Sequence, residues 1–366
     1  MNGRQKPDYV LLFSTALLVL FGFLMVFSAT TMESLQSGDP TYYLKRQFIY
    51  VLIGALALFA GYKIEYSVYK KYSVALLGSA LVLLLAVFVP VVGRSAGGAA
   101  RWIDLGLFSF QPSEVVKIAI ILYLADALAR RGDKIRSFWK GLAPLLCVVG
   151  FFCALIMMQP DLGTVILIFM TSTAMMFLAG ARISHLLALV PPAVLGVLAL
   201  SFASPYRWRR IIAFLDPWKD PLGAGYHIIQ SMIAIGSGGF FGFGLGNSRQ
   251  KFLSLPEQYT DFIFSIVCEE LGLIGAVFLI ALFIFFISRA IRVCRFAPDS
   301  FSRLISGGLT GYIGLQALIN MGVATGSLPT TGIPLPFISY GGTSLVITLF
   351  AVGIILNIST YQRQER

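Results

Sequence analysis

The amino-acid sequence predicts an all-α polytopic membrane protein, and two features of its composition support this fold class. Hydrophobic residues make up 57% of the 366 positions and charged residues only 12%, about half the charged share usual in soluble domains. Apolar runs close to the roughly 20 residues that cross a bilayer recur from end to end. A soluble fold of this size would need far more polar surface.

About ten transmembrane helices are predicted, and we expect them to form one integral membrane domain over residues 1–366. The first apolar run is longer than the apolar part of a signal peptide and lacks a convincing cleavage site, so we expect it to be retained. An even number of spans places both termini on one side. The predicted spans are 9–29, 46–63, 73–93, 111–129, 141–158, 162–180, 184–203, 262–288, 304–325 and 340–358.

The distribution of basic residues predicts the orientation. Lysine and arginine concentrate in the N-terminus and in alternate connections, and cytoplasmic connections of membrane proteins carry this excess. We therefore expect both termini in the cytoplasm. The net charge of +11 follows from this topology and does not indicate nucleic-acid binding. The connections expected on the outer side are 94–110, 204–261 and 326–339.

The fourth span begins with a charged pair near its outer end. Glu114 and Lys117 follow Pro112, which suits the first turn of a helix. A spacing of three places both side chains on one face. Charged residues inside spans are rare and pair with each other or face a cavity. Two interpretations stay open: a structural ion pair, or a polar cavity for an anionic headgroup.

Asp261 ends the long outer connection at the start of the eighth span. A carboxylate there is stabilised by the helix dipole, so a helix cap is one interpretation. The other is a general base held at the outer membrane face beside a basic loop. Asp161, between the fifth and sixth spans, follows Pro160 and is predicted to cap a helix.

Three further segments of the outer connections have distinct compositions. The run 206–210, with Arg207 and Arg210, is basic and aromatic and suits either the membrane interface or phosphate binding. The glycine-rich run 236–246 lacks the spacing of a nucleotide-binding loop, so an irregular or re-entrant loop is expected. The segment 328–344, with Ser339 and Tyr340, is rich in proline and glycine. Irregular backbone at a membrane is tolerated where it lines a cavity, so this segment predicts a site wall.

The sequence offers few residues for metal binding. Its two histidines, His185 and His227, are far apart in the predicted topology, so they cannot build a histidine-based metal site or a Ser-His-Asp set. We predict no resident metal site, and a divalent cation such as Mg²⁺ held by carboxylates stays open.

These motifs, in this order, resemble the SEDS family of FtsW, RodA and SpoVE, and the resemblance covers nearly the whole chain. Within that family the chain is more similar to FtsW and SpoVE. Where family members often have His before the Thr-Asp pair, this chain has Tyr259. The matching segments are Gly98–Ile103 with Arg101 and Trp102, Gln111–Glu114, Gln159–Thr164, Asp216–Trp218 with Gly225 and Tyr226, Pro256–Phe262, and Pro334–Gly342.

The resemblance implies a peptidoglycan glycosyltransferase that polymerises lipid II, the undecaprenyl-pyrophosphate-linked disaccharide pentapeptide. It implies that Asp261 is the general base and that Glu114 and Lys117 lie in a central polar cavity. Lys117, Arg101 and the arginines at 207–210 are candidates to stabilise the pyrophosphate leaving group. It also implies a class B penicillin-binding protein as partner, together with divisome or sporulation proteins.

Two other functions are compatible with the sequence. A lipid II flippase would use the same polar cavity but needs a path through the whole bilayer. A non-catalytic division scaffold would recruit the transpeptidase and tolerate loss of the Asp261 carboxylate.

Overall fold

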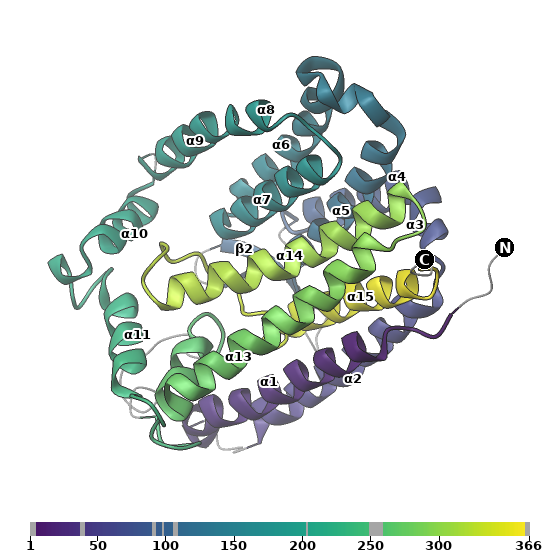
Figure 1. Cartoon of the computed structure of the whole chain (residues 1–366). Helices are drawn as coiled ribbons and strands as arrows, with labels where there is room; N and C mark the ends of the chain where they lie inside the picture. The colour runs from purple at the N-terminus through teal and green to yellow at the C-terminus, as the bar shows by residue number, and fades with distance from the viewer. Residues whose placement is uncertain are drawn as a thin grey trace.

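The protein is a bundle of long helices whose two termini lie at one end (Figure 1). The computed structural model describes residues 5–36, 41–89, 93–96, 99–104, 109–202, 204–248 and 259–362. Its principal helices are α1 (Tyr9–Gln36), α2 (Tyr42–Lys63), α4 (Ser73–Ala86), α5 (Pro112–Arg131), α6 (Ala143–Met158), α7 (Leu162–Leu178), α9 (Val190–Phe202), α13 (Ile263–Arg295), α14 (Ser300–Ala324) and α15 (Gly342–Ser359).

Each predicted span overlaps one of these helices. Within the described ranges, six stretches of helix are long and apolar enough to cross a membrane: Tyr9–Thr30, Tyr42–Lys63, Phe138–Met158, Ile183–Phe202, Ile263–Arg295 and Gly342–Ser359. The chain is therefore a multi-pass helical protein, and the count of ten crossings stays a prediction. The two ends of the chain lie close together, since the Gln5 amide donates to the Thr360 carbonyl at 2.8 Å.

The core of the bundle lies around α5, α14 and α15. Helix α14 packs against α5, α7 and α13, while α15 packs along α2. Glycines bring α2 and α15 close together: a Cβ on Gly61 would lie 2.7 Å from the Phe350 carbonyl oxygen. Small residues at such contacts are typical of membrane helices. In contrast, α9 is almost wholly exposed and lies at the edge of the bundle (Figure 1).

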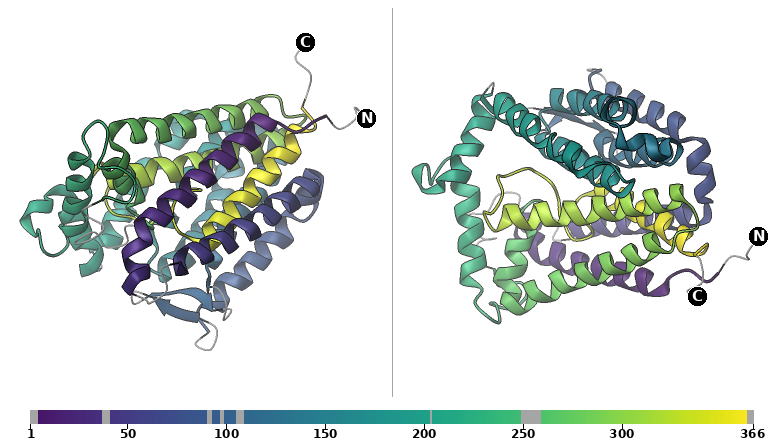
Figure 2. Two further views of the ribbon diagram at one scale, coloured as in Figure 1. Left: turned by 90° about the horizontal axis from the view of Figure 1, so that it is seen from below. Right: turned by 45° about the horizontal axis from the view of Figure 1, so that its top comes forward.

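Two connections contain structure that the sequence did not predict in detail. The connection at 94–110 was expected to be a loop in an all-α fold. Instead it forms a three-stranded antiparallel sheet of β1 (Gly93–Ala96), β2 (Ala99–Asp104) and β3 (Ser109–Phe110). Such short strands show too little alternation to be predicted. In its described residues the long connection contains helices α10 (Pro205–Leu215) and α11 (Tyr226–Ser237), at the end of the bundle away from the termini (Figure 2).

The remaining elements are short. They are the helices α3 (Tyr66–Lys71) and α8 (Ile183–Leu187), the 3-10 turns Gly132–Arg136 and Pro217–Lys219, and the π-helical turn Phe138–Leu142.

Helix α13 differs from the predicted span 262–288, because it is longer and is broken at Gly272 (φ 65°, ψ −162°). The glycine-rich run packs against this break as an irregular loop, as expected. The amides of Leu273 and Ile274 donate to the carbonyls of Gly239 and Phe240 at 2.9 and 3.3 Å. A Cβ on Gly272 would lie 2.5 Å from the Gly242 nitrogen. The loop thus supplies hydrogen bonds that the interrupted helix loses.

Two adjacent carboxylates lie just before the break in α13, and both accept hydrogen bonds from serine hydroxyls. Glu269 and Glu270 are fully buried. Ser28 of α1 donates to Glu270 at 2.5 Å, and the Ser248 hydroxyl donates to Glu269. Buried charge of this kind is tolerated only with such hydrogen bonds. The pair fixes the end of the glycine-rich loop to α13 and α1.

Candidate active site

Asp261 lies in the turn that precedes α13, and its side chain is half-buried. The Asn320 side chain of α14 donates to the Asp261 carbonyl and to the Ile333 carbonyl, both at 2.8 Å. Gly332 lies opposite the carboxylate, since a Cβ there would be 3.7 Å from Asp261 Oδ2. Gly332 has φ +76°, a conformation that favours glycine. Asn320 therefore holds the Asp261 turn against the proline-rich segment.

Ser339 and Tyr340 fix the other side of this turn. The Ser339 hydroxyl donates to the Thr260 carbonyl and accepts from the Leu335 amide at 2.8 Å. The Tyr340 amide donates to the Tyr259 carbonyl at 2.8 Å. Ser339 and Tyr340 thus bond to the backbone of Thr260 and Tyr259, which directly precede Asp261 in the chain. This arrangement is suited to holding the Asp261 turn in place. The prediction that this segment forms a site wall is consistent with that arrangement.

The ring of Tyr340 belongs to a tyrosine cluster at the start of α2. Its centroid lies 5.4 Å from Tyr43 and 5.7 Å from Tyr259. Tyr50 contributes a third neighbour at 6.3 Å. The cluster anchors the proline-rich segment to α2.

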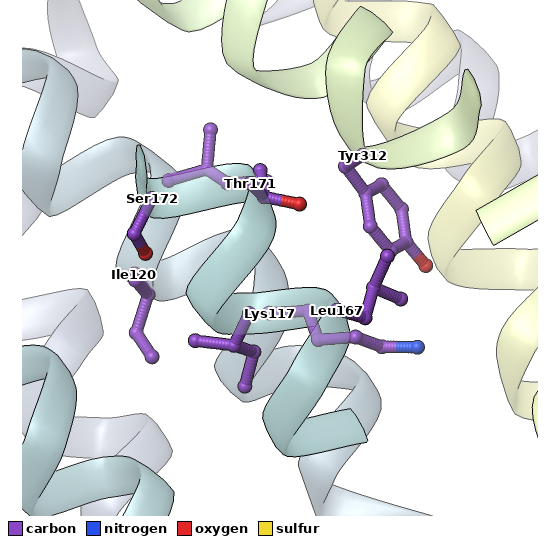
Figure 3. Close-up of a pocket in the computed structure, with 8 residues that line it drawn as sticks. Lys117, Ile120, Leu167, Thr171, Ser172 and Tyr312 are labelled. Carbon is purple, nitrogen blue, oxygen red and sulfur yellow. The ribbon is translucent and has the colours of Figure 1, made fainter. Parts of the chain in front are cut away.

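Glu114 and Lys117 lie on one face of α5, as their spacing predicts. Lys117 Nζ is 2.7 Å from Glu114 Oε1, and both side chains are only 3% exposed. The Lys117 ammonium also lies 5.2 Å from the centre of the Tyr312 ring on α14, and Figure 3 shows these two side chains next to each other. Pro112 occupies the first turn of α5, as expected.

A small cavity of about 10 Å³ adjoins Lys117 between α5, α7 and α14 (Figure 3). Its wall includes the hydroxyls of Thr171, Ser172 and Tyr312. Within the described part of the chain, these hydroxyls and Glu114 Oε2 are buried and have no hydrogen-bond partner. A polar cavity of this size has room for about one water molecule. The wall is therefore suited to an ordered water beside the ion pair.

The turn before α7 connects this ion pair to the proline-rich segment. Asp161 caps α7, as predicted: its carboxylate accepts from the amide and the hydroxyl of Thr164 at 3.0 and 2.8 Å. Helix α7 packs against α5 beside Lys117, where Leu167 and Lys117 line the same cavity. A Cβ on Gly163 would lie 2.5 Å from the Thr331 carbonyl oxygen. Residues 331–332 thus contact the α7 turn on one side and Asp261 on the other.

The predicted cationic residues are positioned differently from one another. Arg101 on β2 donates to the carbonyls of Gln159 and Pro160, the first at 2.7 Å, so it lies over the α7 turn. Arg210 of α10 donates to the Thr330 carbonyl at 3.2 Å, beside the residues that contact Asp261. Arg210 therefore lies against the proline-rich segment, whereas Arg101 lies against the turn between α6 and α7.

Arg207 and Trp102 are less closely tied to this region. Arg207 donates to the Leu200 carbonyl at 3.2 Å and therefore lies toward α9. Trp102 is half-buried on β2 beside Arg101, and its backbone pairs with Arg94.

Sequence reasoning missed Asn320 and Tyr312. Both are polar residues inside an apolar span, which is the signal that would have identified them. The motif at 256–262 was predicted as a unit, but its first part, 256–258, lies outside the described residues.

No metal site is evident in the region that the structure covers. Among the described residues there is no group of three or more histidine, cysteine or acidic side chains that could hold a metal ion. A divalent cation held by carboxylates stays a prediction.

The chain is similar along its full length to proteins of bacterial cell-wall synthesis. A family model described as Cell cycle protein, for FtsW, RodA and SpoVE, matches residues 9–364. A probable peptidoglycan glycosyltransferase FtsW from Geobacter sp. (strain M18) is 45% identical over 364 residues, covering 99% of each chain. The stage V sporulation protein E of Bacillus subtilis (strain 168) is 43% identical over 361 residues, covering 98% of this chain and 99% of that protein.

Solved structures show the same similarity. A chain from a peptidoglycan synthase complex, in a study of how polymerization and crosslinking are coordinated, matches with a TM-score of 0.81 and 33% identity over 98% of this chain and 99% of that one. The rod shape determining protein RodA of Thermus thermophilus matches with a TM-score of 0.72 and 30% identity over 98% of both chains.

Proposed function

This chain belongs to the FtsW/RodA/SpoVE family, and from this membership we propose that it polymerises lipid II into glycan strands with Asp261 as the general base. It is a peptidoglycan glycosyltransferase, since its full-length relatives at up to 45% identity are named for that activity. Its multi-pass helical fold is that of the family.

The position of Asp261 carries the proposed chemistry. The carboxylate stands at the N-terminus of α13, where the helix dipole favours its charged form. It is half-buried, and glycine at position 332 leaves space beside it. A base that takes a proton from a bound hydroxyl must be ionised, reachable and fixed. The hydrogen bonds of Asn320 to the backbone on both sides of this space supply the rigidity.

In the proposed reaction, Asp261 accepts the proton of the GlcNAc 4-hydroxyl of the acceptor. That oxygen forms a bond to C1 of the donor MurNAc, and the bond from C1 to the lipid pyrophosphate breaks with inversion. The pyrophosphate leaves with both bonding electrons, so it needs cationic stabilisation. Arg101 and Arg210 are the best placed of the predicted cations, because Arg210 contacts the segment that faces Asp261 and Arg101 contacts the α7 turn against which that segment packs.

Lys117 has a different role in this proposal. Its charge is already neutralised by Glu114 at 2.7 Å and it is buried with that partner. We assign the pair a positioning role, in which it fixes α5 against Tyr312 of α14.

We place the site at the outer face of the bacterial cytoplasmic membrane, with both termini in the cytoplasm. The excess of basic residues in the connections at the end that carries the termini supports this orientation. At the outer face a sugar donor must arrive attached to a lipid. We assign a class B penicillin-binding protein as the partner, within division or sporulation complexes, because a similar chain is part of a peptidoglycan synthase complex.

One observation weighs against the flippase alternative. The cavity below Lys117 measures about 10 Å³, which accommodates about a water molecule and not a sugar or pyrophosphate headgroup. A flippase would need a continuous polar path through the bundle at this level.

The test is glycan polymerisation from lipid II by the purified protein with its cognate transpeptidase, comparing wild type with Asp261→Asn. We expect long strands from wild type and none from the variant, while the variant keeps its melting temperature and its partner binding. A folded variant with wild-type polymerisation would exclude Asp261 as the base. A wild-type protein that makes no polymer, yet moves lipid II across proteoliposome membranes, would establish the flippase instead.

A further inference from the structure

A second cavity, of about 270 Å³, opens at the end of the bundle that carries both termini. Its α14 wall begins at Ser300, and Asn320, which holds the Asp261 turn, lies 20 residues further along that helix. At 1.5 Å per residue this separation is about 30 Å. The cavity is therefore remote from the candidate active site. Its lining residues come from the ends of α5 and α7, the 132–136 turn and the start of α14.

The backbone creates this cavity. Helices α5 and α7 both end at glycines with positive φ, Gly132 at +50° and Gly180 at +92°. A Cβ added at either glycine would meet no other atom within 4 Å. Open space is therefore left beside these two helix ends and the first turn of α14.

The charged residues that line the cavity are two arginines and one aspartate, Asp133. Arg136 comes from the turn after α5, and Arg303 comes from the first turn of α14. Among the described residues Arg303 makes no salt bridge, and Arg136 has one acidic neighbour, Asp133, at 3.9 Å. The Asp133 side chain is 98% exposed, and an ion pair in solvent contributes little. Both guanidinium groups can therefore engage a ligand at small cost.

A neighbouring arginine adds to the positive charge of this region. Arg131 directly precedes Gly132 of the cavity wall. Its Nη1 is buried and has no hydrogen-bond partner in the part of the chain that the structure describes. The adjacent Arg130 is already paired with Asp126. The local excess of unneutralised guanidinium groups indicates an anionic ligand.

The surroundings of the cavity favour a lipid over a soluble anion. Directly beside its α7 wall, Phe177 and Leu178 are exposed, and Ile183 follows on α8. In a multi-pass protein, exposed apolar side chains at helix ends contact acyl chains. A polar cavity next to such a surface lies at the boundary between headgroups and acyl chains, and basic pockets between membrane helices bind anionic headgroups there.

We propose that this cavity binds the phosphate headgroup of an anionic phospholipid. Arg136 and Arg303 donate to the phosphate oxygens from opposite sides, since guanidinium groups match phosphate with paired donors. The acyl chains lie along the apolar surface of α7 and α8. Asp133, whose side chain is already 98% exposed, stays in solvent beside the bound phosphate. The lipid joins the ends of α5 and α7 to the start of α14.

The test uses the purified full-length protein in a neutral detergent and short-chain dioctanoyl lipids, with affinity measured by thermophoresis. Dioctanoyl phosphatidylglycerol is expected to bind more tightly than dioctanoyl phosphatidylcholine. Arg136→Gln/Arg303→Gln should weaken phosphatidylglycerol binding roughly tenfold or more, the effect of losing hydrogen bonds to a charged group. Ala129→Phe, which fills the cavity without changing charge, should weaken it similarly.

The matched control is Arg292→Gln/Arg295→Gln, which removes two exposed arginines at the same end of the bundle but outside the cavity. It should change the affinity less than about twofold. Equal weakening by this control would show general surface attraction and overturn the proposal. Equal affinity for phosphatidylcholine would overturn it too. Glycerol 3-phosphate binding as tightly as the lipid would identify a soluble phosphate as the ligand and exclude the lipid.

Discussion

The buried pair of Glu114 and Lys117 gives the sharpest prediction, because its removal separates stability from activity. We consider Glu114→Gln first, which leaves Lys117 without its charge partner. The two charges are 2.7 Å apart and both side chains are 3% exposed. Removing one member of such a pair costs about 3–5 kcal/mol, since the remaining charge is buried without compensation.

The structure indicates the lower end of that range. The ring of Tyr312 lies 5.2 Å from the Lys117 ammonium and still stabilises its charge when Glu114 is removed. We therefore expect the free energy of unfolding to fall by about 3 kcal/mol in Glu114→Gln. Thermal unfolding of the detergent-purified protein measures this change. Glu65→Gln, at an exposed carboxylate, is the control and should change stability by less than about 0.5 kcal/mol.

The double variant Glu114→Gln/Lys117→Met removes both charges and keeps the volume. Replacing a buried ion pair by apolar groups is often close to neutral, so we expect stability to return to within about 1 kcal/mol of wild type. Polymerisation of lipid II should nevertheless stay low, because the polar wall of the cavity has changed. Recovery of activity together with stability would show that the pair is structural only. A Glu114→Gln protein as stable as wild type would refute the reasoning on burial.

Three further predictions concern single positions. Asn320→Leu removes two hydrogen bonds to backbone carbonyls, so we expect a stability loss of about 1–3 kcal/mol and a polymerisation rate well below wild type, measured on the same preparation. Gly332→Ala forces a side chain into a left-handed conformation 3.7 Å from Asp261, so the protein should fold, lose about 1–3 kcal/mol and polymerise slowly. Tyr66→Phe removes a 2.8 Å hydrogen bond that the Tyr66 phenol donates to Asp299. Burial, together with this hydrogen bond, raises the pKa of the Tyr66 phenol. The variant should lose about 0.5–1.5 kcal/mol of unfolding free energy, measured by thermal unfolding, without a change in polymerisation.

Each of these predictions has an outcome that would contradict it. Full activity in Asn320→Leu would mean that the Asp261 turn is held by other contacts. An unchanged rate in Gly332→Ala would show that the space opposite the carboxylate is not used. Loss of polymerisation in Tyr66→Phe, at the end of the bundle with the termini, would show coupling between the two ends that the present site does not explain. Gly78→Ala, at a helical glycine with open space beside it, serves as the control for the glycine variant.

Much of the candidate site could be predicted because its residue types are unusual for their positions in the sequence. Glu114 and Lys117 were found since charge inside a span is costly, and their contact follows from a spacing of three on a helix. Asp161 was predicted as a cap from its position after proline, and it is one. The irregular segment 328–344 was predicted from its prolines and glycines. In each case the information lies within a few neighbouring residues.

The contacts between these motifs could not be predicted from their sequences. Nothing local indicates that Gly332 faces Asp261, 71 positions earlier in the chain, or that Thr331 lies against Gly163. The break of α13 at Gly272 was missed for the same reason, because the hydrogen bonds that permit it come from the glycine-rich loop. The sheet at 93–110 was missed because its strands are too short to show alternation.

The sequence by itself determined the class of this protein: a bilayer requires long apolar helices, and that requirement is written in composition and spacing alone. It also identified the charged residues whose burial inside a span costs free energy, and these are residues to which we assign functions. Only the tertiary structure decided that residues 331–333 join Asp261 to the Glu114 and Lys117 region, that Asn320 fixes this junction, and that two helix ends leave a basic cavity at the far end. Those features depend on how helices distant in sequence pack together, and packing is a property of the whole chain.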